Sequence, residues 1–210
     1  MQQFSPEFRS RFHDLLKWRR DVRHFKPDPV NPDHLQSCLE AFTLAPSVGL
    51  SEPWRIVRVK SPTARASALQ NFKAANDEAL QGYSGEKSRL YASLKLTGMQ
   101  DAPEQLAIFC DEETAKGSGL GAKTMPEMRR YSVASGIMAF WLATRAYGIG
   151  VGWVSILDPE QLRRDLGVPE NWALVAYLCV GMPKEETLTP ELQTAGWEER
   201  NAELARWIEV

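Results

Sequence analysis

The chain has 210 residues, of which 43% are hydrophobic and 25% charged, the composition of a single domain with a core over residues 1–210. Its formal net charge of −2 creates no overall field that would attract nucleic acid or an anionic membrane, so neither is an expected partner. The N-terminus lacks a basic-then-apolar signal pattern, and no run reaches the ~20 apolar residues that span a bilayer. These features predict a cytoplasmic protein whose ligand sites arise from local clustering.

Helix-start signals dominate the beginning of the chain. Serine followed by proline at residues 5–6 predicts a helix that leads directly into the arginine-rich segment 19–23. A second start at 31–33 predicts a helix that ends before Pro46. Residues 54–60 place β-branched side chains between charges, which predicts a strand.

The middle of the chain, residues 62–99, is helical in character and is broken at 82–85. It is rich in charge and alanine but has few large apolar groups, so we expect it to cover another part of the molecule. A short buried strand is predicted at 106–110, and a glycine-bearing surface loop follows it at 111–124.

The longest predicted helix covers residues 125–147, and its apolar side chains extend round much of its circumference. Such a helix must be enclosed by a sheet or by another subunit. Glycines at 148, 150 and 152 end the helix and lead into a predicted strand at 153–156.

The last part of the chain predicts a short helix at 159–166 and then a central strand at 172–181, where the apolar run is nearly continuous. The scattered order of helices and strands indicates an α+β fold. Beyond the last strand, the polar arm 182–210 retains large apolar residues, which suggests packing along a neighbouring subunit. These residues are Trp197, Leu204, Trp207 and Ile208.

The cysteines and histidines give no sign of a disulfide or a metal site. Cys38, Cys110 and Cys179 are odd in number, far apart and flanked by apolar residues, which predicts reduced thiols in the core. The three histidines form no paired spacing of the kind that binds zinc.

Three arginines form the strongest candidate anion site. Arg19, Arg20 and Arg23 lie within five residues where a helix ends, and guanidinium groups match phosphate oxygens in pairs. A solvated charged helix end is the alternative reading. Asp21 among the arginines and the neighbouring Val22 favour a partly buried ligand site instead.

Two further segments allow a flat ligand to approach but do not require one. The loop 45–54 packs small residues between two prolines, as many tight loops do. The glycines at 148–152 follow a helix, so they do not form a dinucleotide-binding fingerprint. Ser155 is predicted to project from the strand on the same face as Trp153, and a structural serine is equally compatible with the pattern.

Five motifs occur together in one order along the chain. They are RRDVR at 19–23, APSVG-x-x-x-PW at 45–54, SGE-x-x-x-x-Y-x-SLKL-x-G at 84–98, GIGVGWVSI at 148–156 and GW-x-x-R at 196–200. Together they resemble the 5,6-dimethylbenzimidazole synthase family, or flavin destructases, a branch of the nitroreductase-like flavoproteins. The resemblance covers almost the whole chain. The general nitroreductase pattern would have Ser in place of Asp21, and Asn and Gln in place of Leu50 and Glu52, so these departures count against an ordinary reductase.

The resemblance implies a nitroreductase-like fold with a central mixed sheet flanked by helices. It also implies a homodimer with two FMN sites at the subunit interface, each built from both chains. Reduced FMN is then the substrate and O2 the co-substrate, with no metal. The products are 5,6-dimethylbenzimidazole, the lower ligand of vitamin B12, and a four-carbon sugar phosphate. Residues 76–99 would form a lid over the flavin, which leaves little space for nicotinamide, so a separate NAD(P)H–flavin reductase would supply the reduced FMN.

The same resemblance assigns roles residue by residue. Asp21 would move protons or orient the ribityl hydroxyls, and Ser155 would hydrogen-bond to the reactive edge of the ring, so both are candidate catalytic residues. The implied FMN-binding residues are Arg19, Arg20, Asp21, Val22, Arg23, Pro46, Ser47, Lys95, Leu96, Ser155 and Arg200.

Two other functions remain open at this stage. One is an NAD(P)H-dependent FMN nitroreductase or quinone reductase on the same scaffold, which would retain its flavin. The other is a flavin-binding storage or chaperone module, in which Asp21 and Ser155 would only satisfy buried polar groups.

Overall fold

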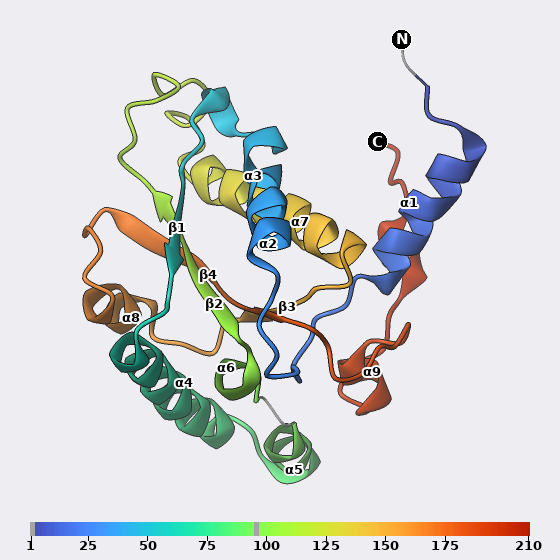
Figure 1. Cartoon of the computed structure of the whole chain (residues 1–210), viewed down its shortest axis with the longest axis vertical. Helices are drawn as coiled ribbons and strands as arrows, with labels where there is room; N and C mark the ends of the chain where they lie inside the picture. Colours follow the sequence, from blue (N-terminus) through green and yellow to red (C-terminus); the bar gives the residue numbers. More distant parts are fainter. Residues whose placement is uncertain (1–2, 95–96) are drawn as a thin grey trace.

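The computed structural model describes residues 3–94 and 97–210 of the chain (Figure 1). Its strands are β1 (Trp54–Arg58), β2 (Glu104–Asp111), β3 (Gly150–Val154) and β4 (Trp172–Gly181). Its α-helices are α1 (Pro6–Trp18), α2 (Pro32–Leu39), α3 (Ala41–Leu44), α4 (Pro62–Gln81), α5 (Gly85–Ser93), α6 (Gly98–Asp101), α7 (Met128–Ala146), α8 (Pro159–Asp165) and α9 (Glu191–Thr194). Two 3₁₀ turns, η1 (Val48–Leu50) and η2 (Ala202–Ala205), complete the described elements.

The expected local signals begin the helices. Ser5 Oγ accepts a hydrogen bond from the Phe8 amide at the start of α1, and Asn31 Oδ1 accepts from two amides at the start of α2. The predicted helical stretch 62–99 is divided into α4, α5 and α6, with the break where the glycines predicted it. None of the helices in the described residues combines the length and hydropathy needed to cross a bilayer.

The four strands form one sheet in the order β1-β2-β4-β3, and each neighbouring pair is antiparallel. The prediction of a mixed sheet was therefore wrong for these strands. A single isolated bridge between Asp21 and Val151 is parallel. The continuous apolar run of β4 indicates only that both of its faces are covered, which parallel sheets usually show, and here helices cover both faces of an antiparallel sheet.

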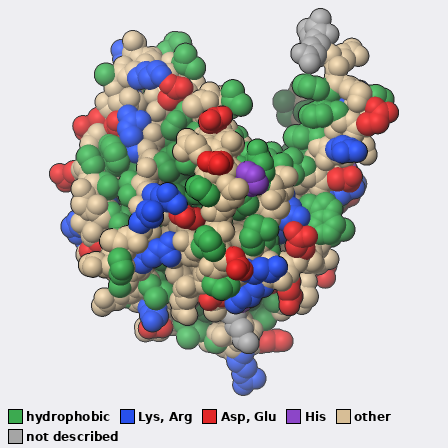
Figure 2. All heavy atoms as spheres, viewed as in Figure 1, with side chains coloured by type: hydrophobic (Ala, Val, Ile, Leu, Met, Phe, Trp, Pro, Cys, Tyr) green, Lys and Arg blue, Asp and Glu red, His purple; other side chains and the backbone are tan. Residues whose placement is uncertain are grey.

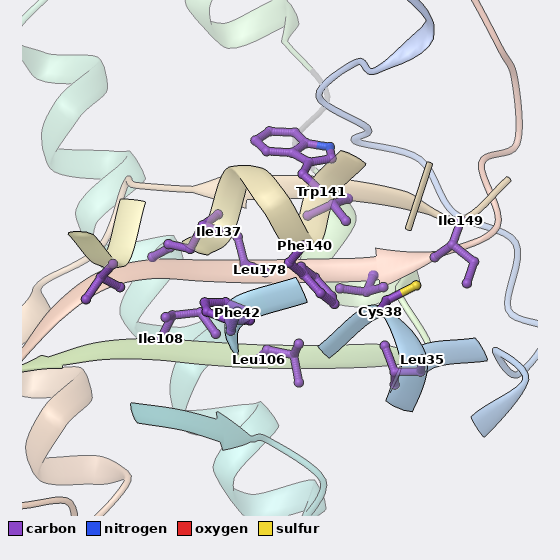
Figure 3. Packing of buried hydrophobic residues seen from close by; sticks show 14 of the residues in the cluster. Leu35, Cys38, Phe42, Leu106, Ile108, Ile137, Phe140, Trp141, Ile149 and Leu178 are labelled. Carbon is purple, nitrogen blue, oxygen red and sulfur yellow. The ribbon is translucent and has the colours of Figure 1, made fainter. Parts of the chain in front are cut away.

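The helices lie on the two faces of this sheet (Figure 1). Helices α2, α3 and α7 cover one face, where Phe42, Phe140 and Leu178 meet between α7 and the strands (Figure 3). Helices α4 and α8 cover the other face, which buries Phe109 and Tyr177. The three cysteines are free and buried in these two cores, as predicted.

The sheet encloses only one side of α7. Ile137 and Phe140 are fully buried, whereas Met138 on the other side is 43% exposed. Helix α1 contacts α7 but buries none of its own residues. Figure 2 shows a hollow between α1 and the rest of the molecule, with hydrophobic side chains along it. The exposed apolar residues of this N-terminal part are Phe4, Phe8, Phe12, Leu16 and Trp18.

Strand β3 begins earlier than predicted, because two glycines lie inside it. A Cβ at Gly152 would stand 2.1 Å from the carbonyl oxygen of Val22, and one at Gly150 would stand 2.8 Å from the Val22 side chain. The glycines therefore serve the close approach of segment 19–25 to the strand. Ser155 lies one residue beyond the end of β3 and is exposed, so the prediction that it projects from within the strand was wrong.

Candidate active site

The site is built on the backbone that follows α1. The Val22 amide donates to the Val151 carbonyl at 3.0 Å, and Lys26 donates to Met182 at 2.8 Å, so the segment runs along the sheet edge. Phe25 is fully buried beneath it. These contacts fix the direction of the alternating side chains between them.

Asp21 is held at both carboxylate oxygens. Oδ1 accepts from the Trp153 amide at 2.9 Å, and Oδ2 accepts from Arg23 Nε at 3.3 Å. Burial raises the pKa of Asp21, although the Trp153 amide and the charges of Arg23 and Arg19 act in the opposite direction. The carboxyl therefore protonates more readily than its arginine neighbours alone would allow.

Each arginine of the predicted triplet has a different environment. The guanidinium of Arg19 lies 4.9 Å from the ring centroid of Trp141, and Arg20 Nε donates to the Leu188 carbonyl at 2.9 Å. Arg23 Nη1 is buried and has no hydrogen-bond partner in the described residues. Glu191 Oε1 is 3.8 Å from this nitrogen, which is too far for a hydrogen bond. The triplet therefore retains donors for an anion.

A cavity of about 140 Å³ gathers these groups. Burial and the nearby charge of Arg200 lower the pKa of Arg19 and of Arg20. Four arginines against two carboxylates leave an excess of positive charge, which suits an anionic ligand such as a phosphate. The residues that line this cavity are Arg19, Arg20, Asp21, Arg23, Pro190, Glu191, Leu192 and Arg200.

Asp21 also borders two other cavities. One, of about 130 Å³, contains Ser155 and has walls that include Phe72, Met99 and Ile156. The other, of about 540 Å³, extends from Arg20 and Arg23 toward the end of α7. The carboxylate thus stands where the arginine-lined cavity meets a partly apolar cavity with a serine hydroxyl.

The structure brings together most of the predicted site residues. The members of this group are Arg19, Arg20, Asp21, Val22, Arg23, Ser155 and Arg200. Lys95 and Leu96 lie outside the described residues. Pro46 and Ser47 line none of these three cavities.

Pro46 and Ser47 lie instead at the far end of α7. The Val48 amide donates to Ser132 Oγ at 3.0 Å in the first turns of that helix, whereas Arg19 lies over Trp141. Ser132 and Trp141 are nine residues apart, which is roughly 14 Å along a helix. One chain alone does not place this loop beside its own arginines.

The loop 45–54, in which Leu50 and Glu52 depart from the general nitroreductase pattern, contains an internal hydrogen bond. Ser47 Oγ accepts from the Glu52 amide at 3.1 Å. Leu50 and Glu52 both adopt positive φ, at 54° and 42°, and Glu52 forms an ion pair with Lys116. Leu50 is 70% exposed. Within its own chain, Glu52 therefore has a partner other than a flavin.

Sequence reasoning missed two residues near the site, Glu191 and Thr97. The Glu191 carboxylate faces Arg23, with its Oε1 also 4.0 Å from His24 Nε2, and Thr97 Oγ1 contacts His24 Nδ1 at 2.9 Å. Glu191 and Thr97 lie far from Arg23 and His24 in the sequence, and no local pattern signals them. No group of three His, Cys, Asp or Glu in the described parts of the chain is placed to hold a metal ion.

Comparison with known proteins identifies the scaffold. A model of the nitroreductase family matches residues 16–182. The chain belongs to the nitroreductase family. It is 50% identical to a 5,6-dimethylbenzimidazole synthase of Rhodospirillum rubrum, with 94% of this chain and 93% of that protein covered. It is 45% identical to one of Rhodobacter capsulatus, with 93% and 95% covered.

Solved structures agree on the fold. Iodotyrosine deiodinase, crystallised with FMN and 3-iodo-L-tyrosine, matches with a TM-score of 0.76 at 20% identity, over 95% of this chain and 100% of that chain. The α+β nitroreductase-like fold is thereby confirmed. The resemblance to the 5,6-dimethylbenzimidazole synthase branch of the nitroreductase family is confirmed by the two curated relatives.

Proposed function

We propose that this protein is a 5,6-dimethylbenzimidazole synthase, which fragments reduced FMN with O2 to give the lower ligand of vitamin B12 and a four-carbon sugar phosphate. Two of its curated relatives carry that name at 45–50% identity over nearly the whole chain. The observation that carries the proposal is Asp21, a carboxylate fixed by Trp153 and Arg23 between the arginine cavity and Ser155.

The residues present fit FMN. Arg19, Arg20, Arg23 and Arg200 surround a cavity of about 140 Å³ with excess positive charge, and the buried Arg23 Nη1 lacks a partner among the described residues. A phosphate would supply the missing acceptor oxygens. The neighbouring cavity with Ser155 and its apolar walls suits part of a flat ring.

The chemistry depends on a proton carrier and on exclusion of water. Bound reduced FMN supplies the electrons that O2 accepts. Asp21 holds or releases a proton at Oδ2, because burial brings its pKa closer to neutrality while Oδ1 stays fixed on the Trp153 amide. Ser155 presents a hydroxyl that can donate to the ring, and Met99 and Ile156 limit the access of water.

A homodimer completes this proposal. Pro46 and Ser47 lie far from the arginines of their own chain, so a flavin that touches both sets needs the loop of a second chain. Helix α1 and the end of the C-terminal arm expose large apolar side chains that a second copy can cover. The reduced FMN would come from a separate NAD(P)H–flavin reductase.

The deciding experiment mixes the purified protein with chemically reduced FMN in air and measures 5,6-dimethylbenzimidazole by chromatography. We expect product with the wild type and at least about a 100-fold lower rate with Asp21→Asn, which keeps the shape but not the proton exchange. Asp28→Asn makes the same change at an exposed site outside the three cavities and should retain the rate.

The other outcomes assign the other functions. Intact FMN together with NADPH oxidation would identify a flavin reductase. Intact FMN without NADPH oxidation, and with Asp21→Asn changing affinity alone, would identify a binding module. Either result would overturn the synthase.

A further inference from the structure

A cluster of aromatic residues joins the C-terminal arm to α5. The Trp197 ring stands edge-on to Tyr83, with centroids 5.5 Å apart and an interplanar angle of 84°, and lies 6.1 Å from Tyr91. Lys87 Nζ is 4.6 Å from the centroid of the indole and donates to the Trp197 carbonyl at 2.7 Å. Trp197, which the sequence assigned to a partner subunit, thus packs within its own chain.

Both ends of this cluster are anchored. On the α5 side, Tyr91 is buried, stacks on Tyr83 at 4.9 Å and donates from its hydroxyl to Asn76 Oδ1 in α4 at 2.9 Å. On the arm side, the Trp197 amide donates to the Leu192 carbonyl at 2.8 Å. Leu192 lines the arginine cavity, so the cluster connects α4 and α5 to that cavity.

Arg200 follows Trp197 by three residues and borders the cavity beside Arg19 and Arg20. Burial, and after it the charge of Arg200, lowers the pKa of both neighbours, so the three guanidinium groups repel one another when no ligand is bound. Among the described residues, no hydrogen bond or ion pair of its own side chain opposes this repulsion, and Arg200 is exposed. Another contact of the arm must therefore set its position.

We infer that Trp197 is a positioning residue: by docking on α5 it sets Arg200 at the anion cavity, so recognition of the phosphate depends on α5. The identity of the anion as the FMN phosphate rests on the proposed function. The consequence is that binding of the phosphate and the position of α5 are coupled through one indole.

The test compares FMN with riboflavin, which lacks the phosphate, by calorimetry on the full-length protein. We expect Trp197→Ala and Arg200→Gln each to weaken FMN binding about ten-fold and to leave riboflavin binding unchanged. The double variant should be no weaker than Arg200→Gln alone, because both changes remove the same interaction. Tyr147→Ala, which truncates an aromatic residue that is 47% exposed and lines none of the three cavities, should bind both flavins as the wild type does.

Two milder changes test the same contact if Trp197→Ala does not fold. Trp197→Phe keeps an aromatic ring and the backbone carbonyl, so it should retain most of the affinity for FMN. Lys87→Met should weaken FMN binding about three-fold. The same change at Lys60, an exposed lysine beyond β1, should have no effect.

Three results from the variants would overturn the inference: equal losses for FMN and riboflavin, losses that multiply in the double variant, or unchanged FMN binding in Trp197→Ala and Lys87→Met. A wild type that binds both flavins equally would overturn it as well. Failure to form 5,6-dimethylbenzimidazole would instead overturn the proposed function, which these binding measurements do not require.

Discussion

The two sides of the arginine cavity are built differently. On one side, residues 19–25 are joined to β3 by the Val22–Val151 backbone hydrogen bond and by the hydrogen bond from the Trp153 amide to Asp21, and the Phe25 side chain of this segment is fully buried. On the other side, the part of the arm that carries Arg200 is attached at the surface of α5, where Lys87 binds the Trp197 carbonyl and the Trp197 ring meets Tyr83. The first side positions Asp21 before any ligand arrives, whereas the second can change its position at little cost to the core.

The largest expected effect comes from Gly152 on the buried side. In Gly152→Ala the new Cβ would stand 2.1 Å from the Val22 carbonyl oxygen, so backbone must move. We expect a loss of at least about 2 kcal/mol in the free energy of unfolding and weaker FMN binding, measured by urea denaturation and calorimetry. Gly82→Ala, which meets only a 3.3 Å neighbour at the end of α4, should change stability by less than about 1 kcal/mol.

If Gly152→Ala were as stable as Gly82→Ala, the segment would not be tied to β3 as the contacts indicate. The distinction between a fixed and an adjustable side of the cavity would then disappear.

The second prediction uses the pH dependence of stability. Because burial raises the pKa of Asp21, the folded protein binds this proton more tightly than the unfolded chain does. The ionised carboxyl therefore costs stability above the raised pKa, and that cost disappears as the pH falls toward the ordinary value of ~3.9. Asp21→Asn does not titrate.

Wild type should consequently lose stability relative to Asp21→Asn between pH 4 and pH 7, as measured by denaturant unfolding at both values. A relative gain over the same range would mean that the arginines outweigh burial. The buried side of the cavity would then hold a tightly paired carboxylate rather than a proton carrier.

A smaller effect is expected on the α5 side. Tyr91→Phe removes the hydrogen bond to Asn76 that ties α5 to α4, at a cost of about 1 kcal/mol. Hydrogen exchange should become faster in α5, whereas protection of β2 and β4 should stay the same. Tyr131→Phe, at an exposed tyrosine, is the matched control. Faster exchange in the central strands would show that α5 is part of the core.

Much of the fold was predictable from short-range signals. Ser5 and Asn31 cap helices through their own side chains, and the apolar run of β4 marks a central strand because it is covered on both faces. The strand direction was not predictable, since burial on both faces does not distinguish parallel from antiparallel neighbours. The bounds of β3 were missed because its glycines make room for Val22, which lies more than 120 residues earlier in the sequence.

The site was predictable to a similar extent. The arginine triplet and Asp21 stood out because four charges in five residues need an explanation. The partners of these residues were not predictable, because the Trp153 amide and Glu191 are distant in the sequence and come close only in the folded chain. The placement of Pro46 and Ser47 needs a second chain, and a single sequence does not show how two copies meet.

The smallest effect within one chain is expected at Trp207, which is 97% exposed near the end of the arm. Trp207→Ala should change the free energy of unfolding of the monomer by less than about 0.5 kcal/mol, because the Trp207 ring buries almost no apolar surface in one chain. In the proposed dimer the same ring is covered, so sedimentation should show weaker association. Trp197→Ala should give the opposite pattern, with weaker FMN binding and unchanged association. Identical behaviour of the two variants would mean that the arm acts as one unit, and that Trp197 has no separate role at the cavity.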